Sequence, residues 1–256
     1  RGKVFYVNVL YAEALSALEY LGGDLGPVRP TTVVERINSI FWPESEHALD
    51  SCLAHERPSG RRVQRFPHVT TRRALAAAID PERQHYLSHV DYGNVVDRLD
   101  VLANCLAILF GVAVGERARI IATRLASAAD MSPYPSRAWE EPDNGEDARS
   151  LWDRGAEVFQ DPRWHNAPYR YHNAGVWPMI GGFLVAALAR AGLLVDAKRQ
   201  LVRLIDANRQ ARDGGHWGFH EWLDGRDGSP QGTPFQAWSA GALLVAIRSV
   251  TPGIGQ

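Results

Sequence analysis

The stretch NAGVWPMIGGFLVAALARA, residues 173–191, followed by VDAKRQLVRLIDANRQA, residues 195–211, decides the fold. The first segment is apolar on almost every side, which is typical of a helix buried inside a protein. The second carries Leu201, Leu204 and Ile205 on one face and charges on the other, which indicates a helix at the surface. A short turn joins them. The sequence therefore predicts a hairpin of one inner and one outer helix.

The same pattern recurs along the chain. Residues 97–114, DRLDVLANCLAILFGVAV, are strongly apolar, residues 116–129 are amphipathic, and residues 235–250 repeat the apolar half. A long irregular insert at 130–170 separates the hairpins, and long loops in compact domains are commonly functional. Two concentric layers of helices with long loops at one rim describe an α/α toroid, whereas a simple bundle does not need such loops. Strand signals are weak, so we expect an all-α fold.

The N-terminal part is expected to add three more helices. Their predicted ranges are 4–21, with Val7, Leu10, Tyr11, Ala14, Leu15 and Leu18 sharing one face, 33–41, with Thr32 as its cap, and 71–78. Residues 43–69 are polar and interrupted by prolines, and they are expected to form a loop with short strands. The chain enters an apolar helix almost at once, without a Met or a leader, so residues 1–256 are expected to be the C-terminal portion of a single barrel domain.

Composition excludes several classes of function. The 256 residues carry a formal net charge of -1, which offers no basic surplus for nucleic acid. No run of 18 uncharged apolar residues predicts a membrane span, and a cytoplasmic location is expected. Cys105 falls in an apolar run and is predicted to be a buried free thiol. His85, His89 and Asp91 lack the spacing of a metal site, so neither a metal nor another cofactor is expected.

The stretch GGHWGFHEWLDGRDGSPQGTPFQAWSAG, residues 214–241, carries the chemistry. It sets one carboxylate, Glu221, among Trp217, Phe219 and Trp222. Aromatic faces stack on sugar rings, and a carboxylate can activate a water molecule. The combination favours a sugar site. An acidic surface loop with tryptophans that serve only the core remains the alternative.

Four segments resemble the neutral/alkaline invertases and related glycosidases, in the order in which that family has them. They are FYVNVLYAEAL, DRLDVLANCLAILFGVA, YHNAGVWP and EWLDGRDGSPQGTPFQAWSAG. The relatives are (α/α)6-barrel, six-hairpin glycosidases of clan G, among them processing α-glucosidases, mannosylglycerate hydrolases and debranching-type enzymes. Seven or eight helices are fewer than six pairs, so this resemblance implies an incomplete toroid and a missing N-terminal half or partner chain that completes the barrel.

The resemblance implies an inverting glycoside hydrolase that acts on a small α-linked glycoside, such as sucrose or a glucosyl or mannosyl conjugate. Glu221 would be the general base, and the general acid would precede Arg1. Tyr6 and Asn8 stand where the family has glutamate and glutamine. The residues expected near the sugar are Tyr171, His172, Asn173, Trp177, Trp222, Gln236, Trp238, Asp97, Arg98 and Asn8.

Simpler roles stay open for several of these residues. His172 could be satisfied by the backbone at a helix start, Trp177 could be plain core, and Asp97 could match a helix dipole. A non-catalytic carbohydrate-binding or scaffold protein that lacks the general acid is the alternative function, and Tyr6 favours it. A polysaccharide lyase or epimerase on an α/α toroid is a third possibility.

Overall fold

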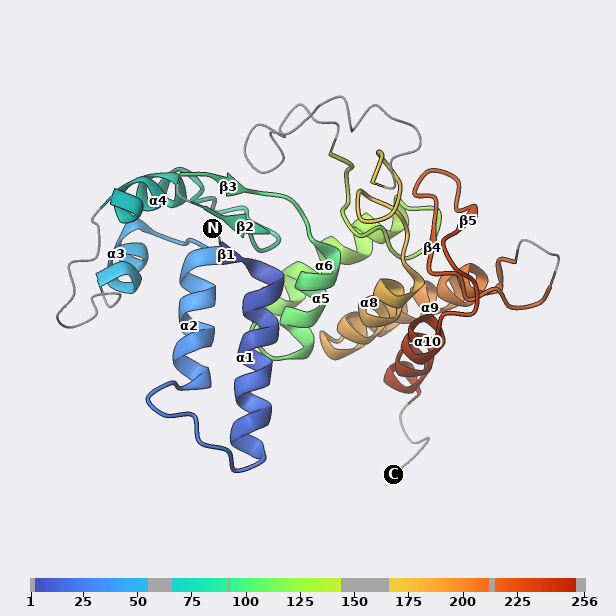
Figure 1. The fold of residues 1–256 in the computed structure, drawn as a ribbon, viewed down its shortest axis with the longest axis horizontal. Helices are drawn as coiled ribbons and strands as arrows, with labels where there is room; N and C mark the ends of the chain where they lie inside the picture. The colour runs from blue at the N-terminus through green and yellow to red at the C-terminus, as the bar shows by residue number, and fades with distance from the viewer. Residues whose placement is uncertain (1–2, 55–65, 92, 144–165, 212–214, 252–256) are drawn as a thin grey trace. The chain divides into compact units, whose positions relative to one another are not determined.

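The computed structural model describes two compact units (Figure 1). The first comprises residues 1–99 and 110–113, and the second comprises residues 100–109 and 114–256. The residues described are 3–54, 66–91, 93–143, 166–211 and 215–251. Helices dominate both units, and each strand is only two residues long, so the all-α class is confirmed.

The first unit is built from α1 (Phe5–Tyr20), α2 (Pro30–Phe41), α3 (Glu46–Ala54), α4 (Phe66–Ala77), β1 (Lys3–Val4), β2 (His89–Val90) and β3 (Val95–Val96). The strands form a small antiparallel sheet in the order β1-β2-β3. Its core is aromatic, because the Phe5 ring lies 4.4 Å from that of Tyr86 and 5.2 Å from that of Phe41. These contacts join the start of α1 to the end of α2.

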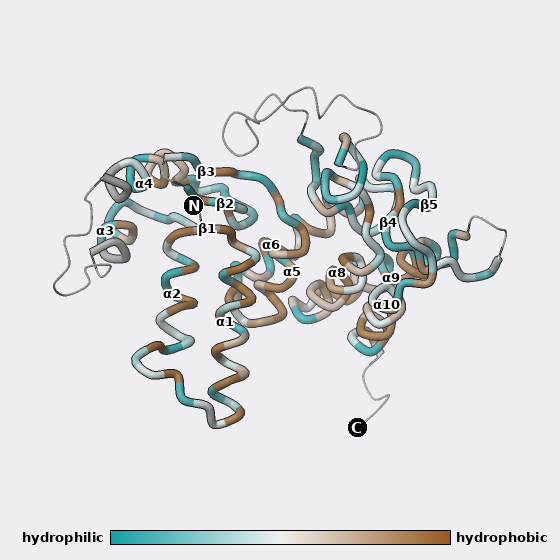
Figure 2. Tube along the Cα trace, viewed as in Figure 1, coloured by the Kyte–Doolittle hydropathy of each residue, from teal (hydrophilic) through white to brown (hydrophobic). Residues whose placement is uncertain are grey.

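The apolar face identified on α1 in the sequence is not the face that the helix buries. Phe5, Val9 and Ala12 are the buried residues of this helix, whereas Val7 is 58% exposed and Tyr11 is 47% exposed. The helix is apolar around most of its circumference, so its periodicity did not reveal which side packs on α2. Figure 2 shows hydrophobic residues, in brown, at intervals along the whole of α1.

Three other expectations for the first unit also fail. Residues 46–54 form α3 rather than a loop, and α4 begins at Phe66, five residues before the predicted start. Thr32 does not cap α2, because the helix begins at Pro30 and Arg29 is its N-cap. Proline fixes φ near the helical value and suits the first turn, which explains the earlier start.

The second unit contains the predicted hairpins. Its elements are α5 (Val101–Leu109), α6 (Gly115–Asp130), α8 (Pro178–Arg190), α9 (Leu194–Arg209), β4 (Trp222–Leu223), β5 (Pro230–Gln231) and α10 (Ala237–Val250). α5 and α8 are mostly buried, whereas α6 and α9 bury one face only. The alternation of inner and outer helices is therefore confirmed for these two pairs. Cys105, on α5, is a buried free thiol as predicted.

Close packing of α8 on α10 depends on a glycine. A Cβ atom at Gly182 would lie 2.5 Å from the carbonyl oxygen of Ala242, so no larger residue fits there. Figure 1 shows these two helices beneath the β4–β5 hairpin. Gly181 and Gly182 both lie inside the continuous helix α8. Gly182 faces α10, whereas Gly181 faces the backbone at Pro135.

Irregular chain fills the part of the insert that the structure describes. Residues 131–143 follow α6 without helix, and residues 166–177 precede α8 as turns and isolated bridges, while 144–165 lie outside the described residues. α5 spans only Val101–Leu109, which is shorter than the predicted 97–114, because residues 97–100 lie outside the helix and turns follow it at 110–113. No helix in the described ranges is long and apolar enough to cross a membrane.

Candidate active site

The two segments singled out in the sequence lie side by side. Leu223 of β4 donates a backbone hydrogen bond to Val176 over 2.7 Å and accepts one from it over 2.9 Å. Gly225 also donates to the carbonyl of Tyr169 over 2.7 Å. The bridge joins the YHNAGVWP segment to the strand that begins directly after Glu221. A constellation predicted from residues about fifty positions apart is thus brought together.

Glu221 lies at the mouth of the β4–β5 hairpin and is partly exposed. Its backbone N–H donates to the carbonyl of Thr233 over 2.9 Å, and the N–H of Thr233 donates to Glu221 Oε2 over 3.4 Å. The start of α10 is tied to the segment that precedes β4, because Gln236 N–H donates to the carbonyl of Phe219 over 2.9 Å. Gln236 is the N-cap residue of α10. Strand and helix together fix the backbone on both sides of the carboxylate.

A cluster of aromatic rings lies next to this strand. His172 stacks on Trp177 with ring centroids 4.8 Å apart and planes 4° from parallel. Tyr171 lies 5.0 Å from Trp177 and 6.1 Å from Trp222, and Trp238 lies 6.5 Å from Trp177. All five rings were expected near a sugar, and the structure joins them into one cluster.

Burial divides this cluster into two layers. Trp222 is 1% exposed and Trp177 is 4% exposed, so neither offers an open face for a sugar. His172 covers one face of Trp177, and His172 itself is exposed, as is Trp238 at 47%. Their low exposure favours a supporting position for these two tryptophans over the expected contact with sugar, which stays a prediction. Within this cluster of described rings, His172 and Trp238 are the exposed ones.

Asn173 has a structural position that differs from the expected contact with sugar. Its amide nitrogen donates to the carbonyls of Asp143 and Asn166 over 2.9 and 3.0 Å, and its oxygen accepts from Asp143 N–H over 2.6 Å. The residue is buried. These three bonds join two loops of the insert to the segment that leads into α8. Asn173 therefore holds these segments together and has no open surface for a ligand.

Strained backbone is concentrated around Glu221. The non-glycine residues with positive φ in the described part of the chain are Tyr169, Tyr171, Ala174, Phe219 and Phe235. Three lie in the segment that leads into α8 and is hydrogen-bonded to β4, one lies just before β4, and one lies just before α10. The left-handed conformation costs a non-glycine residue about 1–2 kcal/mol and persists where surrounding structure enforces it, which happens most often at functional sites.

Gly232 was not singled out in the sequence. It has φ +61, and a Cβ atom there would lie 2.7 Å from Glu221 Oε2. The only signal for it was its place in a loop rich in glycine, aspartate and proline, where many glycines serve turns alone. Packing against the carboxylate could not be foreseen from that pattern.

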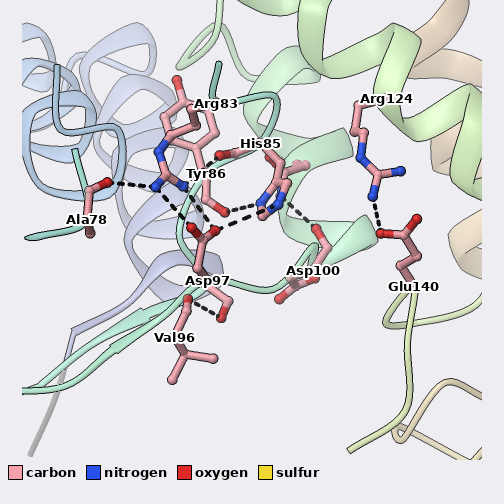
Figure 3. Close-up of polar contacts among 11 residues, drawn as sticks. Ala78, Arg83, His85, Tyr86, Val96, Asp97, Asp100, Arg124 and Glu140 are labelled. Atoms are coloured by element: carbon pink, nitrogen blue, oxygen red, sulfur yellow. Dashed lines mark hydrogen bonds and ion pairs between the residues drawn. The ribbon is translucent and has the colours of Figure 1, made fainter. Parts of the chain in front are cut away.

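Three expected site residues belong to the first unit. Asn8 donates its side-chain N–H to the carbonyl of Val4 over 2.7 Å, and Arg98 is half-buried. Asp97 accepts two hydrogen bonds of 3.0 Å from Arg83, whose guanidinium also donates to Ala78 (Figure 3). Asp97 and Arg98 precede α5 rather than lying on it, which corrects their expected helical position. These bonds give Asp97 a structural partner.

The charge at the start of α5 is that of Asp100. Its Oδ1 accepts the backbone N–H of Ala103 over 3.0 Å, as an N-cap side chain does. Burial raises the pKa of Asp100 to about 6, against the opposing effect of backbone hydrogen bonds from Ala103 and Leu102. Among the described residues, no three His, Cys, Asp or Glu side chains gather as a metal site requires.

Comparison with known proteins identifies the family of this chain. Residues 75–251 match the sequence profile of the family described as alkaline and neutral invertase. Two relatives from Arabidopsis thaliana are the probable alkaline/neutral invertase D, 30% identical over 172 residues, and the probable alkaline/neutral invertase F, 28% identical over 173 residues. Each match covers 63% of this chain and 29% or 31% of the relative. The chain thus spans about a third of the length of these curated relatives.

Similar solved structures include the mannosylglycerate hydrolase of Thermus thermophilus. Its complex with Tris and D-glycerate has a TM-score of 0.45 at 18% identity, over 85% of this chain and 44% of that one. An uncharacterized conserved protein from the same organism has a TM-score of 0.46 at 19% identity, over 93% of this chain and 52% of that one.

Proposed function

Because the chain belongs to the alkaline and neutral invertase family, we propose that it forms the general-base side of an inverting glycoside hydrolase. The substrate class is a small α-linked glycoside, with sucrose or a glucosyl or mannosyl conjugate as its simplest members. Glu221 is the general base. His172 and Trp238 contact the sugar, and Tyr171, Trp177 and Trp222 support them.

One observation carries this proposal: Glu221 is a partly exposed carboxylate beside a cluster of aromatic rings. Within the described residues, its side chain accepts a single hydrogen bond, from the N–H of Thr233. A general base must accept a proton during the reaction, so a carboxylate already committed to an arginine would serve poorly. Glu221, which accepts a backbone N–H and no arginine bond within the described residues, meets this requirement.

The proposed reaction follows from the geometry that inversion requires. A water oxygen forms a bond to the anomeric carbon while Glu221 takes a proton from that water. The bond between the anomeric carbon and the leaving oxygen breaks, and a carboxylic acid gives its proton to that oxygen. Inverting enzymes keep the two carboxyl groups about 6.5–9.5 Å apart, which leaves room for the water. We propose that this acid belongs to another segment of the natural gene product, as the family resemblance implies.

The helices that complete a toroid are the second part of the proposal. Val7 and Leu10 on α1 are exposed, and so are Leu244 and Val245 on α10. Contiguous apolar faces of this kind commonly mark interaction sites. We propose that additional helices of the same barrel, from the same gene product or a partner chain, cover them. A cytoplasmic location stays a prediction.

The test uses the natural gene product and begins with its intact mass. Release of monosaccharide is then measured from sucrose, trehalose and glucosylglycerate. A product much heavier than 28.4 kDa that releases sugar, and loses that activity in Glu221→Gln, would support the hydrolase. Release unchanged in Glu221→Gln would contradict the role of the base.

Binding without turnover is the outcome that favours the alternative. Tyr6, where the family has glutamate, is the observation behind it. A product of 28.4 kDa that binds these sugars and releases nothing would make the protein a non-catalytic carbohydrate-binding module.

A further inference from the structure

The β4–β5 hairpin is irregular beside Glu221. Trp222 pairs with Gln231 and Leu223 pairs with Pro230, so the same register would set Glu221 opposite Gly232. Instead, Glu221 N–H donates to the carbonyl of Thr233, one residue further along. Gly232, with φ +61, is the additional residue of a β-bulge. Bulges of this kind redirect side chains and are frequent next to active sites.

Gly232 lies against the side chain that the bulge faces. A Cβ atom at this position would be 2.7 Å from Glu221 Oε2, 2.8 Å from Glu221 Cβ and 2.7 Å from Trp222 Cδ1. Real Cβ atoms do not approach other atoms so closely, so a larger residue would have to displace the carboxylate or the indole. Trp222 is fully buried and cannot move easily. The carboxylate is the group that would shift.

The bulge also changes the partner of a backbone amide. The N–H of Thr233 points to Glu221 Oε2 at 3.4 Å. This bond is long, as bonds to catalytic groups commonly are before a substrate is bound. With Oε2 engaged by the amide, Oε1 is the oxygen that we assign to the attacking water.

We propose that the Gly232 bulge is a positioning element for the general base. Gly232 provides the space in which the Glu221 carboxylate lies, and the Thr233 N–H fixes the direction of that carboxylate. The inference rests on the proposed function of Glu221. Gly232 and Thr233 act through Glu221 and do not contact the reacting atoms.

The experiment compares two glycine substitutions in the natural gene product, assayed with whichever of sucrose, trehalose and glucosylglycerate it hydrolyses. Gly232→Ala should lower kcat about 100-fold with KM changed less than about threefold, because a displacement of about 1 Å can cost that much. Gly192→Ala is the matched control. Gly192 has φ +83 and a Cβ atom added there would meet nothing within 4 Å, so this variant has backbone strain without a clash. Its kcat should stay within about twofold.

A double variant separates positioning from a general structural effect. In Glu221→Gln, the further change Gly232→Ala should cost no additional activity, because both changes act on one group. Circular dichroism and the melting temperature establish folding. If Gly232→Ala does not fold, Thr233→Pro removes the N–H and should lower kcat about tenfold, whereas Thr233→Ala keeps the N–H and should not.

The outcomes are distinguishable. Loss of activity in Glu221→Gln, with Gly232→Ala no worse than Gly192→Ala, would overturn the positioning role and leave the base intact. An additive loss in the double variant would also overturn it. Full activity in Glu221→Gln would overturn the proposed function, and the positioning role would fall with it.

Discussion

Two carboxylates expected in the site have opposite surroundings. Asp97, in the first unit, accepts two hydrogen bonds from Arg83, whose side chain is 2% exposed, and lies 3.7 Å from His85 Nε2 (Figure 3). Glu221, in the second unit, accepts within the described residues one long hydrogen bond from a backbone amide. Both were expected in one sugar site, Glu221 as the general base and Asp97 as a residue near the sugar.

The difference separates a structural role from a chemical one. A carboxylate that compensates a buried guanidinium must keep its charge, because an isolated buried charge is costly. A carboxylate that is to accept a proton from water must have an oxygen available for it. Asp97 therefore stabilises the fold, and Glu221 is suited to catalysis. Removing each charge in turn tests this contrast.

Glu221→Gln should have the largest effect and should act on catalysis alone. We expect kcat of the natural gene product to fall about 1,000-fold, equivalent to about 4 kcal/mol in the activation barrier. The urea unfolding midpoint should be unchanged, because the amide can still accept the Thr233 N–H. Initial rates and urea titrations on the same preparation provide the measurement. A large loss of stability would show that Glu221 resembles Asp97 after all.

Asp97→Asn should act on stability. Arg83 is buried and would lose its counter-charge, so we expect unfolding to become easier by about 2 kcal/mol, less than for a fully buried pair because Asp97 is half exposed. Asp50→Asn is the matched control in the same unit, since Asp50 also binds an arginine, Arg72, but in the open. Its unfolding midpoint should barely move. Equal shifts for both variants would contradict the importance of burial.

The sequence predicted the large features well, for a physical reason. α8 is apolar on nearly all sides and α9 on one side only. The distribution of apolar residues predicts which faces are buried, and the two helices are buried on those faces. The convergence of Glu221 with His172 and Trp177 was inferred from motifs, and the bridge between Val176 and Leu223 confirms that their segments meet.

What the sequence missed depends on relations between distant atoms. The buried face of α1 is not encoded by periodicity, because apolar residues occupy most of its circumference. Trp222 and Trp238 have the same side chain, yet only the former is buried, since tertiary packing alone decides which ring stays accessible. Likewise, the sequence does not distinguish Gly232 from the other loop glycines, because its proximity to Glu221 arises only in the folded chain.

Asp100 offers a third carboxylate environment, and pH tests it. Its folded pKa of about 6 lies above the ordinary value of 3.8, so the folded state holds this proton more tightly than the unfolded state. The contribution of Asp100 to stability should therefore be greatest below pH 4, fall between pH 4 and pH 6, and stay level above. Asp100→Asn keeps an N-cap side chain but cannot titrate. In this variant, the fall in the free energy of unfolding between pH 4 and pH 7 should be smaller by about 2 kcal/mol. Urea unfolding at pH 4, 5, 6 and 7 measures it, and an unchanged slope would show that other groups cause it.

The smallest effect concerns the strain around Glu221, which has no counterpart among the described non-glycine residues near Asp97. Phe235 has φ +59 and is 72% exposed, so its ring contributes little packing while its backbone is strained. Phe235→Gly relieves the strain and Phe235→Ala retains it. The glycine variant should therefore be about 1 kcal/mol more stable than the alanine variant, even though glycine gains more freedom on unfolding. Thermal melts of the two variants compare them directly. Equal stability would mean that the backbone at residue 235 relaxes on its own, and that the loop before α10 does not depend on its hydrogen bonds to Gly218 and Phe219 for its conformation.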